Sequence, residues 1–306
     1  MNLYSLVDFY DCFEEIRNIT RIEALKLFHY TSKDKKEKIL GNDKLVLWFS
    51  RADKFLDKNE GTQILEPYYY ACGELYDKKV IGKNFYDLLK GIEYNDLQRN
   101  VSNKWVICFS SDGSSQDMKS RYAPRDGYVL GLNMNDGYGC CDKFNREGTY
   151  ICMKNVCYEQ ETMRRYFLKG LQEVYNRYSR AVVGKNDVEV EEMNGMLREY
   201  LISSVLEYAL IYKGSNYAYE KEIRLICEVG NNFDKWEDKE NGYLIQMCDI
   251  GETPHLEIHL PKDRLIIESQ KVLPYQCTEL NKAILTREEI RKYSFVFENE
   301  RRKELL

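Results

Sequence analysis

The chain has 306 residues, of which 31% are charged and 43% hydrophobic, a balance typical of globular proteins. With 45 basic and 50 acidic residues, the formal net charge is −5, which argues against a surface that binds nucleic acid over its whole extent. Only 5 prolines and 18 glycines occur, so a collagenous, linker-dominated or intrinsically disordered chain is excluded.

The N-terminal sequence MNLYSLVDFYDCFEEIRNIT lacks both the basic segment and the continuous apolar segment of a secretory signal. No apolar run approaches the roughly 18 residues that a membrane-spanning helix requires. We therefore expect a cytoplasmic protein that does not enter a membrane. In that reducing compartment the 10 cysteines should be thiols, most of them buried as small hydrophobic side chains. The absence of a C-x-x-C motif argues against a zinc finger or ribbon.

Apolar spacing predicts that the chain opens with an amphipathic helix over residues 3–16. A strand follows at 22–30, and then a short helix that Thr31 or Ser32 caps and that ends at Leu40. The next predicted elements are a strand at 44–49, an aromatic-rich helix at 62–76, a strand at 105–110, a polar helix at 114–122, and strands at 127–134 and 149–158.

Two long helices are predicted next, at about 159–182 and 190–212, because each has an apolar stripe with helical spacing. Further strands are expected at 217–229, 243–249, 255–260 and 264–274, before a charged terminal helix over 286–306. Strands on both sides of a helical middle, without a βαβ rhythm, predict an α+β fold. We interpret residues 159–212 as a helical insertion between two parts of one sheet, within a single domain that spans residues 1–306.

Several common catalytic motifs are missing: the chain has no P-loop, no dinucleotide-binding glycine motif, no G-x-S-x-G and no H-E-x-x-H. His255, Glu257 and His259 alternate along a predicted strand and therefore share one face. Two histidines and one glutamate can bind a metal, but a solvated strand face is the simpler interpretation. We expect no metal.

The segment YAYEKEIRLIC at 217–227 is the most informative one. If it is a continuous strand, Glu220, Glu222 and Arg224 point to the same side. One interpretation is an exposed face with a surface ion pair, which contributes under ~1 kcal/mol. The other is a catalytic pair, in which one carboxylate stabilises an oxocarbenium-like sugar and the other orients or deprotonates the acceptor.

Two other segments supply possible partners for these carboxylates. His29 lies at a strand end and is followed by Tyr30 and Thr31, so it can hold a ribose hydroxyl and a carboxamide through hydrogen bonds. The alternative is a structural histidine. The polar helix near 114–122 ends in Tyr122, whose ring can stack on a flat heterocycle or simply anchor a surface helix.

Together these segments resemble the DUF2971 family of bacterial proteins over about residues 27–230. The resemblance rests on FHYTS, KLVLWFS with FLDKNEG, WVICFSSDGSSQDMKSRYAPRDGYVLGLN and YKGSNYAYEKEIRLI, in that order. That family is in turn similar to the ADP-ribosyltransferase fold of the diphtheria-toxin and poly(ADP-ribose) polymerase type, which implies a split mixed or antiparallel sheet. The chain departs from the family pattern at Lys119, where a tryptophan is usual, in the loop 56–60, and at Tyr30, where the polymerases have glycine.

The resemblance implies specific roles for these residues. Glu222 would be the catalytic carboxylate and Glu220 the first glutamate of a Glu-x-Glu pair. The residues expected to bind NAD are His29 on the ribose, Tyr30 on the carboxamide, Tyr122 on the nicotinamide face, and Thr31, Ser110 and Arg224 around them.

The implied function is transfer of ADP-ribose from NAD to a protein or nucleic acid, in a toxin or anti-phage effector with a possible antitoxin or regulatory partner. The alternatives are an NAD glycohydrolase and a non-catalytic module that senses a nucleotide.

Overall fold

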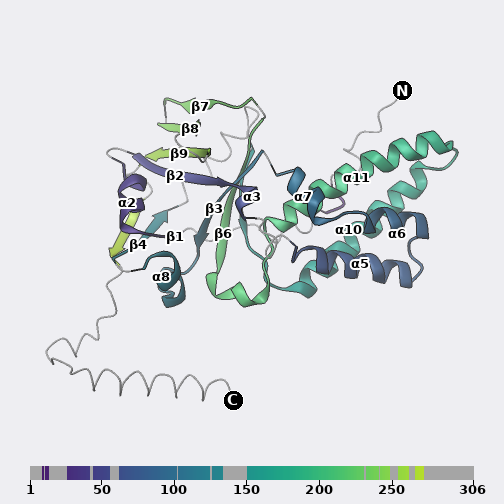
Figure 1. The fold of residues 1–306 in the computed structure, drawn as a ribbon, viewed down its shortest axis with the longest axis horizontal. Helices are drawn as coiled ribbons and strands as arrows, with labels where there is room; N and C mark the ends of the chain where they lie inside the picture. Colours follow the sequence, from purple (N-terminus) through teal and green to yellow (C-terminus); the bar gives the residue numbers. More distant parts are fainter. Residues whose placement is uncertain are drawn as a thin grey trace, which may run out of the picture.

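The computed structural model describes residues 9, 11–13, 26–41, 44–55, 62–101, 103–124, 126–133, 150–230, 232–240, 242–248, 254–261 and 266–271. The fold is α+β, as predicted, with a large antiparallel sheet and several helices. In Figure 1 the strands occupy one part of the molecule, and beside them gather the helices α5 (Leu65–Asp77), α6 (Lys83–Lys90), α7 (Tyr94–Arg99), α10 (Gln160–Ala181) and α11 (Asp187–Ala209). The expected terminal helix at 286–306 lies outside the described residues, as does most of the expected helix at 3–16.

The described part of the sheet has ten strands, and every strand pair in it is antiparallel. They are β1 (Lys26–Thr31), β2 (Lys44–Arg51), β3 (Lys104–Ser110), β4 (Tyr128–Asn133), β5 (Tyr150–Asn155), β6 (Glu222–Glu228), β7 (Lys235–Asp238), β8 (Tyr243–Cys248), β9 (His255–Pro261) and β10 (Ile266–Lys271). All predicted strands are present, with shifted ends, and β7 was not predicted.

Strand β3 joins the parts of the sheet. Along one edge it pairs with β6 over its whole length, from Lys104 to Ser110. It pairs with β2 at Trp105 and Val106 and with β1 at Ser110, so these two strands meet opposite ends of β3. The strand order is β10-β4-β1-β3-β2-β9-β8-β7, and β6 and β5 lie off this path. The centre of the sheet is therefore where β1, β3 and β6 come together.

The described helices are α2 (Lys33–Ile39), α3 (Ala52–Phe55), α5 (Leu65–Asp77), α6 (Lys83–Lys90), α7 (Tyr94–Arg99), α8 (Gln116–Tyr122), α10 (Gln160–Ala181), α11 (Asp187–Ala209) and the 3₁₀ helix η2 (Ser215–Glu220). Ser32 caps α2, as expected, by accepting a hydrogen bond from the backbone of Lys35. The sequence analysis did not predict α3, α6 or α7. No described helix is long and apolar enough to cross a membrane.

Alternate residues of the central strands face two different cores. One face of β3 and β6 carries Phe109, Ile223 and Leu225, which pack with apolar residues of β1, β2, β8 and β9. The opposite face carries Val106 and Ile226, which pack with the helices. The helices α10 and α11 lie between β5 and β6 in the chain, yet these two strands pair directly with each other. The helical stretch therefore leaves and rejoins the sheet at neighbouring positions.

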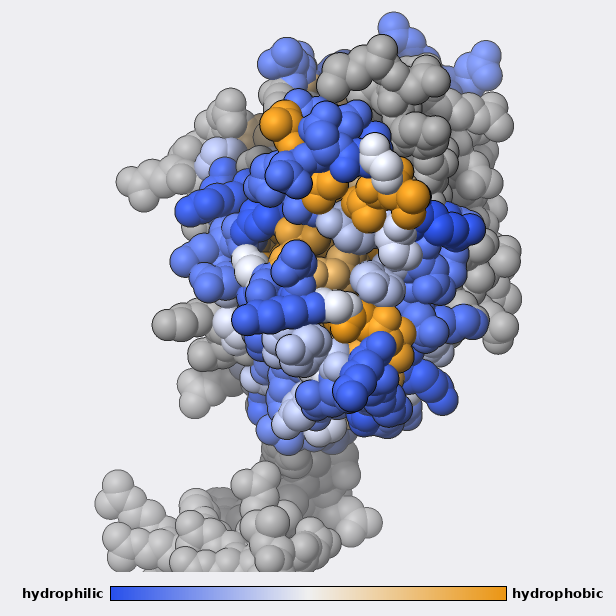
Figure 2. Space-filling view, turned by 90° about the vertical axis from the view of Figure 1, so that its right-hand side faces the viewer, coloured by the Kyte–Doolittle hydropathy of each residue, from blue (hydrophilic) through white to orange (hydrophobic). Residues whose placement is uncertain are grey.

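The end of the molecule formed by the helices is mainly hydrophilic, with separate apolar patches between the charged side chains (Figure 2). In the connection between α10 and α11 and the first turn of α11, Val183 and Val188 are 78% and 70% exposed. Isolated exposed valines are ordinary on a protein surface. The chemically informative residues lie instead beneath the helices, against the sheet.

Candidate functional site

Four charged side chains, which we call the charge quartet, meet at the start of β6. Lys213 follows α11, Glu220 ends η2, and Glu222 and Arg224 belong to β6. The Lys213 Nζ atom lies 2.8 Å from Glu220 Oε2 and 2.7 Å from Glu222 Oε2. Arg224 donates to Glu222 from Nε at 2.9 Å and from Nη2 at 3.2 Å. No member is more than 8% exposed, so the interpretation of an exposed strand face is wrong.

The backbone before β6 does not follow the predicted strand. Residues 215–220 form the 3₁₀ helix η2, and β6 begins only at Glu222. Between them Lys221 has a φ of 44°, in the left-handed region, which turns the chain sharply. The turn is held by Ser110 Oγ, which donates to the Glu220 carbonyl at 2.7 Å, and by the Glu222 N–H, which donates to Tyr158 Oη at 2.8 Å. This turn at Lys221 is what allows the carboxylates of Glu220 and Glu222 to reach the same Lys213 ammonium group.

Opposite charges keep Glu222 ionised despite its burial. Burial by itself raises the pKa of Glu222, but the charges of Arg224 and Lys213, with hydrogen bonds from Arg224 and the Cys108 thiol, lower it to about 2. Burial and the nearby Glu222 charge raise the pKa of Cys108 well above its usual range, so this thiol stays protonated. Two carboxylates and two cations give the quartet no net charge.

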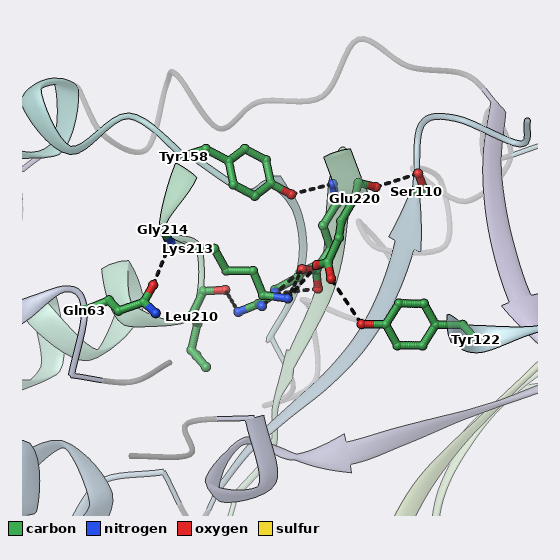
Figure 3. A network of polar contacts seen from close by, with 10 residues as sticks. Gln63, Ser110, Tyr122, Tyr158, Leu210, Lys213, Gly214 and Glu220 are labelled. Atoms are coloured by element: carbon green, nitrogen blue, oxygen red, sulfur yellow. Dashed lines mark hydrogen bonds and ion pairs between the residues drawn. The ribbon is translucent and has the colours of Figure 1, made fainter. Parts of the chain in front are cut away.

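Tyr122 links the quartet to the surface. Its side chain reaches the carboxylates from the side opposite Lys213 (Figure 3), and its hydroxyl donates to Glu220 Oε1 at 3.1 Å. The residue is 46% exposed. Partial burial and the charge of Glu220 raise its pKa to about 12, so the hydroxyl keeps its proton. Tyr122 therefore combines an exposed ring with a hydroxyl fixed on a buried carboxylate.

Tyr30 and Ser110 support this arrangement from the sheet. The Tyr30 ring packs with Met118, Ala123 and Val129 beneath α8, and its hydroxyl donates to the carbonyl of Asp112. Ser110 is fully buried and holds the turn before β6, as described above. Ser110 therefore lies beside the quartet, whereas Tyr30 lies under α8, and the hydroxyl groups of both are already bonded to backbone atoms.

His29 and Thr31 point away from the quartet. Residues that face each other in an antiparallel pair project to the same side of a sheet. Ser110 faces Glu222 in β6 and Phe28 in β1, so Phe28 shares the side of the quartet. Alternation along β1 then places His29 and Thr31 on the other side. The resemblance implied that His29 and Glu222 lie together, and the structure separates them.

The surroundings of His29 agree with this placement. Its ring lies 5.8 Å from that of Phe109, centre to centre, and its Nδ1 atom is 3.2 Å from the carbonyl oxygen of Cys108. Burial lowers the pKa of His29, so the ring is neutral at pH 7. Thr31 is buried as well, and its hydroxyl has no hydrogen-bond partner among the described residues. Both residues are part of the sheet's interior.

Three residues in contact with the two glutamates were not predicted from the sequence: Lys213, Tyr158 and Cys108. A usable signal existed for Lys213, because it is the only basic residue between 206 and 219 and directly follows the apolar residues Leu210, Ile211 and Tyr212. A lysine in such a segment is buried only when a carboxylate compensates its charge. No comparable signal distinguished Tyr158 or Cys108 from core residues.

A second polar cluster lies on β8 and β9. His255, Glu257 and His259 share one strand face, as the alternation predicted. The expectation that this face is solvated is wrong. His255 and Glu257 are each 9% exposed. Glu257 lies between the two histidines and contacts both through different oxygens.

The structure brings most, but not all, of the expected site residues together. Glu220, Glu222, Arg224, Ser110 and Tyr122 are joined by direct contacts, Tyr30 packs nearby under α8, and His29 and Thr31 lie on the other side of the sheet. No protein-family model, no curated protein and no solved structure matches this chain.

Proposed function

We propose that the chain binds NAD beside Tyr122 and transfers ADP-ribose to a macromolecular acceptor, on a sheet of the ADP-ribosyltransferase type. One observation carries this proposal. Glu220 and Glu222 arrive from different elements and converge on one cationic atom, Lys213 Nζ, next to the exposed ring of Tyr122. A site that holds two carboxylates around a positive charge is suited to a reaction that develops positive charge on a sugar.

In the proposed reaction the bond between nicotinamide nitrogen and ribose C1′ breaks, and its electron pair leaves with nicotinamide. The ribose then carries positive charge, which Glu222 stabilises while Arg224 keeps the carboxylate in place. An acceptor nucleophile forms the new bond to C1′ and gives its proton to Glu220. Tyr122 provides a ring on which nicotinamide stacks.

This mechanism requires Lys213 to move. In the structure its ammonium neutralises both carboxylates and lies where the cationic ribose would need to be stabilised. Binding of NAD must therefore displace the Nζ atom from at least one carboxylate. A ligand would first bind on the exposed side chain of Tyr122, whose hydroxyl contacts Glu220, and would displace the ammonium group from there.

A second candidate function is a nucleotide-sensing module without catalysis. The observation that favours it is the complete pairing of the carboxylates, with Glu220 2% and Glu222 4% exposed. In this case the quartet holds the start of β6 in place, and NAD or a related nucleotide binds on Tyr122 without reacting.

Incubation of the purified chain with NAD labelled in its adenylate part, together with a cell lysate, separates these functions. Label on macromolecules supports the transferase, free ADP-ribose indicates a glycohydrolase, and bound but intact NAD indicates the sensor. Glu222→Gln should abolish labelling, with a fall in kcat of ~10²-fold or more. Glu228→Gln, on the same strand, is the matched control and should leave labelling unchanged. Labelling that persists in folded Glu222→Gln protein would refute the assignment.

A further inference from the structure

The hairpin of β8 and β9 brings three possible metal ligands together. Cys248 faces His255 directly across the strand pair, and Gln246 faces Glu257. Residues that face each other project to the same side, and alternation adds Glu257 to the side of His255. The thiol sulfur of Cys248, a ring nitrogen of His255 and a carboxylate oxygen of Glu257 all lie within 4.8 Å of one another.

The surrounding residues orient the glutamate. His255 Nε2 lies 3.2 Å from Glu257 Oε1. The other oxygen, Oε2, lies 2.9 Å from His259 Nε2 and accepts a hydrogen bond from Gln246 Nε2 at 3.2 Å. Gln246 and His259 thus hold Oε2 and leave Oε1 directed toward His255. Metal-binding carboxylates in proteins are commonly oriented by such secondary hydrogen bonds.

The histidine is held in place as well. The exposed Trp48 indole lies over the His255 ring, with ring centres 4.2 Å apart and planes 32° from parallel. The three ligand residues are at most 9% exposed. A buried thiol, imidazole and carboxylate whose rotamers are restricted by neighbours form a prepared donor set, unlike an acidic patch on a surface.

We propose that Cys248, His255 and Glu257 bind one zinc ion, with His259 and Gln246 as orienting partners. A sulfur, a nitrogen and an oxygen donor match the ligand preference of zinc, whereas calcium and magnesium select oxygen donors alone. Three protein ligands leave the fourth tetrahedral position to a water molecule. This proposal replaces the expectation of no metal and is independent of the proposed function.

The geometry needs only a small contraction. Zinc bonds of about 2.0–2.3 Å place tetrahedral ligands roughly 3.3–3.8 Å apart. His255 and Glu257 are already at 3.2 Å, and no separation among the three ligand atoms exceeds 4.8 Å, so none has to shorten by more than about 1.5 Å. On binding, the Cys248 thiol releases its proton to solvent and the thiolate coordinates zinc. The metal bonds replace the hydrogen bonds that Glu257 accepts from Cys248 and His255, while its contacts with His259 and Gln246 remain.

The experiment uses the full chain, stripped of metal with a chelator and then titrated with Zn²⁺ or, as a spectroscopic probe, Co²⁺. We expect an intense thiolate-to-cobalt charge-transfer band and a Tm that rises by several degrees with zinc. Cys248→Ser should lose the band, and Glu257→Gln should weaken zinc binding about 10-fold or more. Cys152→Ser, a partly buried cysteine on β5, is the matched control and should keep both signals.

Circular dichroism of the metal-free variants checks that they fold, and the wild-type spectrum decides the question without any variant. Absence of a thiolate band in the wild-type cobalt protein would overturn the proposal. The same conclusion would follow if folded Cys248→Ser bound zinc as tightly as the wild type, since the metal would then occupy an adventitious surface site.

Discussion

The charge quartet makes a quantitative prediction about stability. Glu222→Gln keeps the shape of the side chain and removes its charge. The variant leaves the fully buried guanidinium of Arg224 without the carboxylate that accepts its two hydrogen bonds at 2.9 and 3.2 Å. It also removes one of the two carboxylates that neutralise Lys213. We expect a large loss of stability at neutral pH, because two buried cations then share one carboxylate.

The magnitude follows from the pKa of Glu222. Its value of about 2 in the folded chain, against 4.5 for an ordinary glutamate, corresponds to about 3 kcal/mol of stability at neutral pH. Removing one partner from a buried ion pair typically costs about 3–5 kcal/mol. Because the folded pKa is depressed, this contribution is present above about pH 5 and is lost as the pH falls toward 2. The difference between wild type and variant should therefore shrink over that range.

Urea denaturation of both proteins between pH 7 and pH 3 measures this difference. The matched control is Glu228→Gln, at the other end of β6, whose carboxylate lies 2.7 Å from Lys104 but is 38% exposed. Lys104 is itself only 7% exposed, but the solvated carboxylate weakens the pair, so we expect a smaller loss of about 1–2 kcal/mol. The reasoning would be refuted if Glu222→Gln cost no more than the control, or if its cost did not change with pH.

Three further predictions concern other parts of the structure. Gly127→Ala places a methyl group 2.6 Å from the backbone of Ala123, so we expect a lower Tm. By contrast, the methyl group of Gly195→Ala in α11 meets no atom within 4 Å, and this variant should raise stability by about 0.5–1 kcal/mol. Tyr122→Phe removes one hydrogen bond and should reduce the unfolding free energy by only about 1 kcal/mol. Tyr122→Ala also removes the ring and should weaken NAD binding. Equal NAD affinity in both variants would contradict the stacking role. An NMR titration of His29 should give a pKa below 6.5, because burial lowers it, and the histidine should therefore reduce stability as the pH falls below 6.5. Titration near 6.5 would show that the ring is solvated.

The outcome for His29 shows where sequence reasoning stops. Alternation along β1 separates Tyr30 from His29 and Thr31, so these three residues cannot all project to one side. Which side faces the carboxylates depends on the pairing of Phe28 with Ser110, and of Ser110 with Glu222. Strand register is a property of the assembled sheet, and nothing in a single strand specifies it.

The carboxylates show a different limit. Their spacing correctly predicted that Glu220 and Glu222 act on the same side, but the predicted strand was wrong before Glu222, where η2 and the left-handed Lys221 turn the chain. Period-two patterning describes only extended backbone. The turn is held by Ser110 at the end of β3 and by Tyr158 between β5 and α10, and such distant partners leave no mark in the local sequence.

Local sequence therefore determined the elements: the apolar stripes of α10 and α11, the apolar strands, and the serine that caps α2. It also determined that charged groups cluster near the start of β6. Tertiary structure decided the rest: the charges of Lys213 and Arg224 are compensated within residues 213–224, but the turn that brings these residues together is held by Ser110 and Tyr158 from elsewhere in the chain. The periodicity of a segment specifies its own faces, whereas the register between segments decides which of those faces meet.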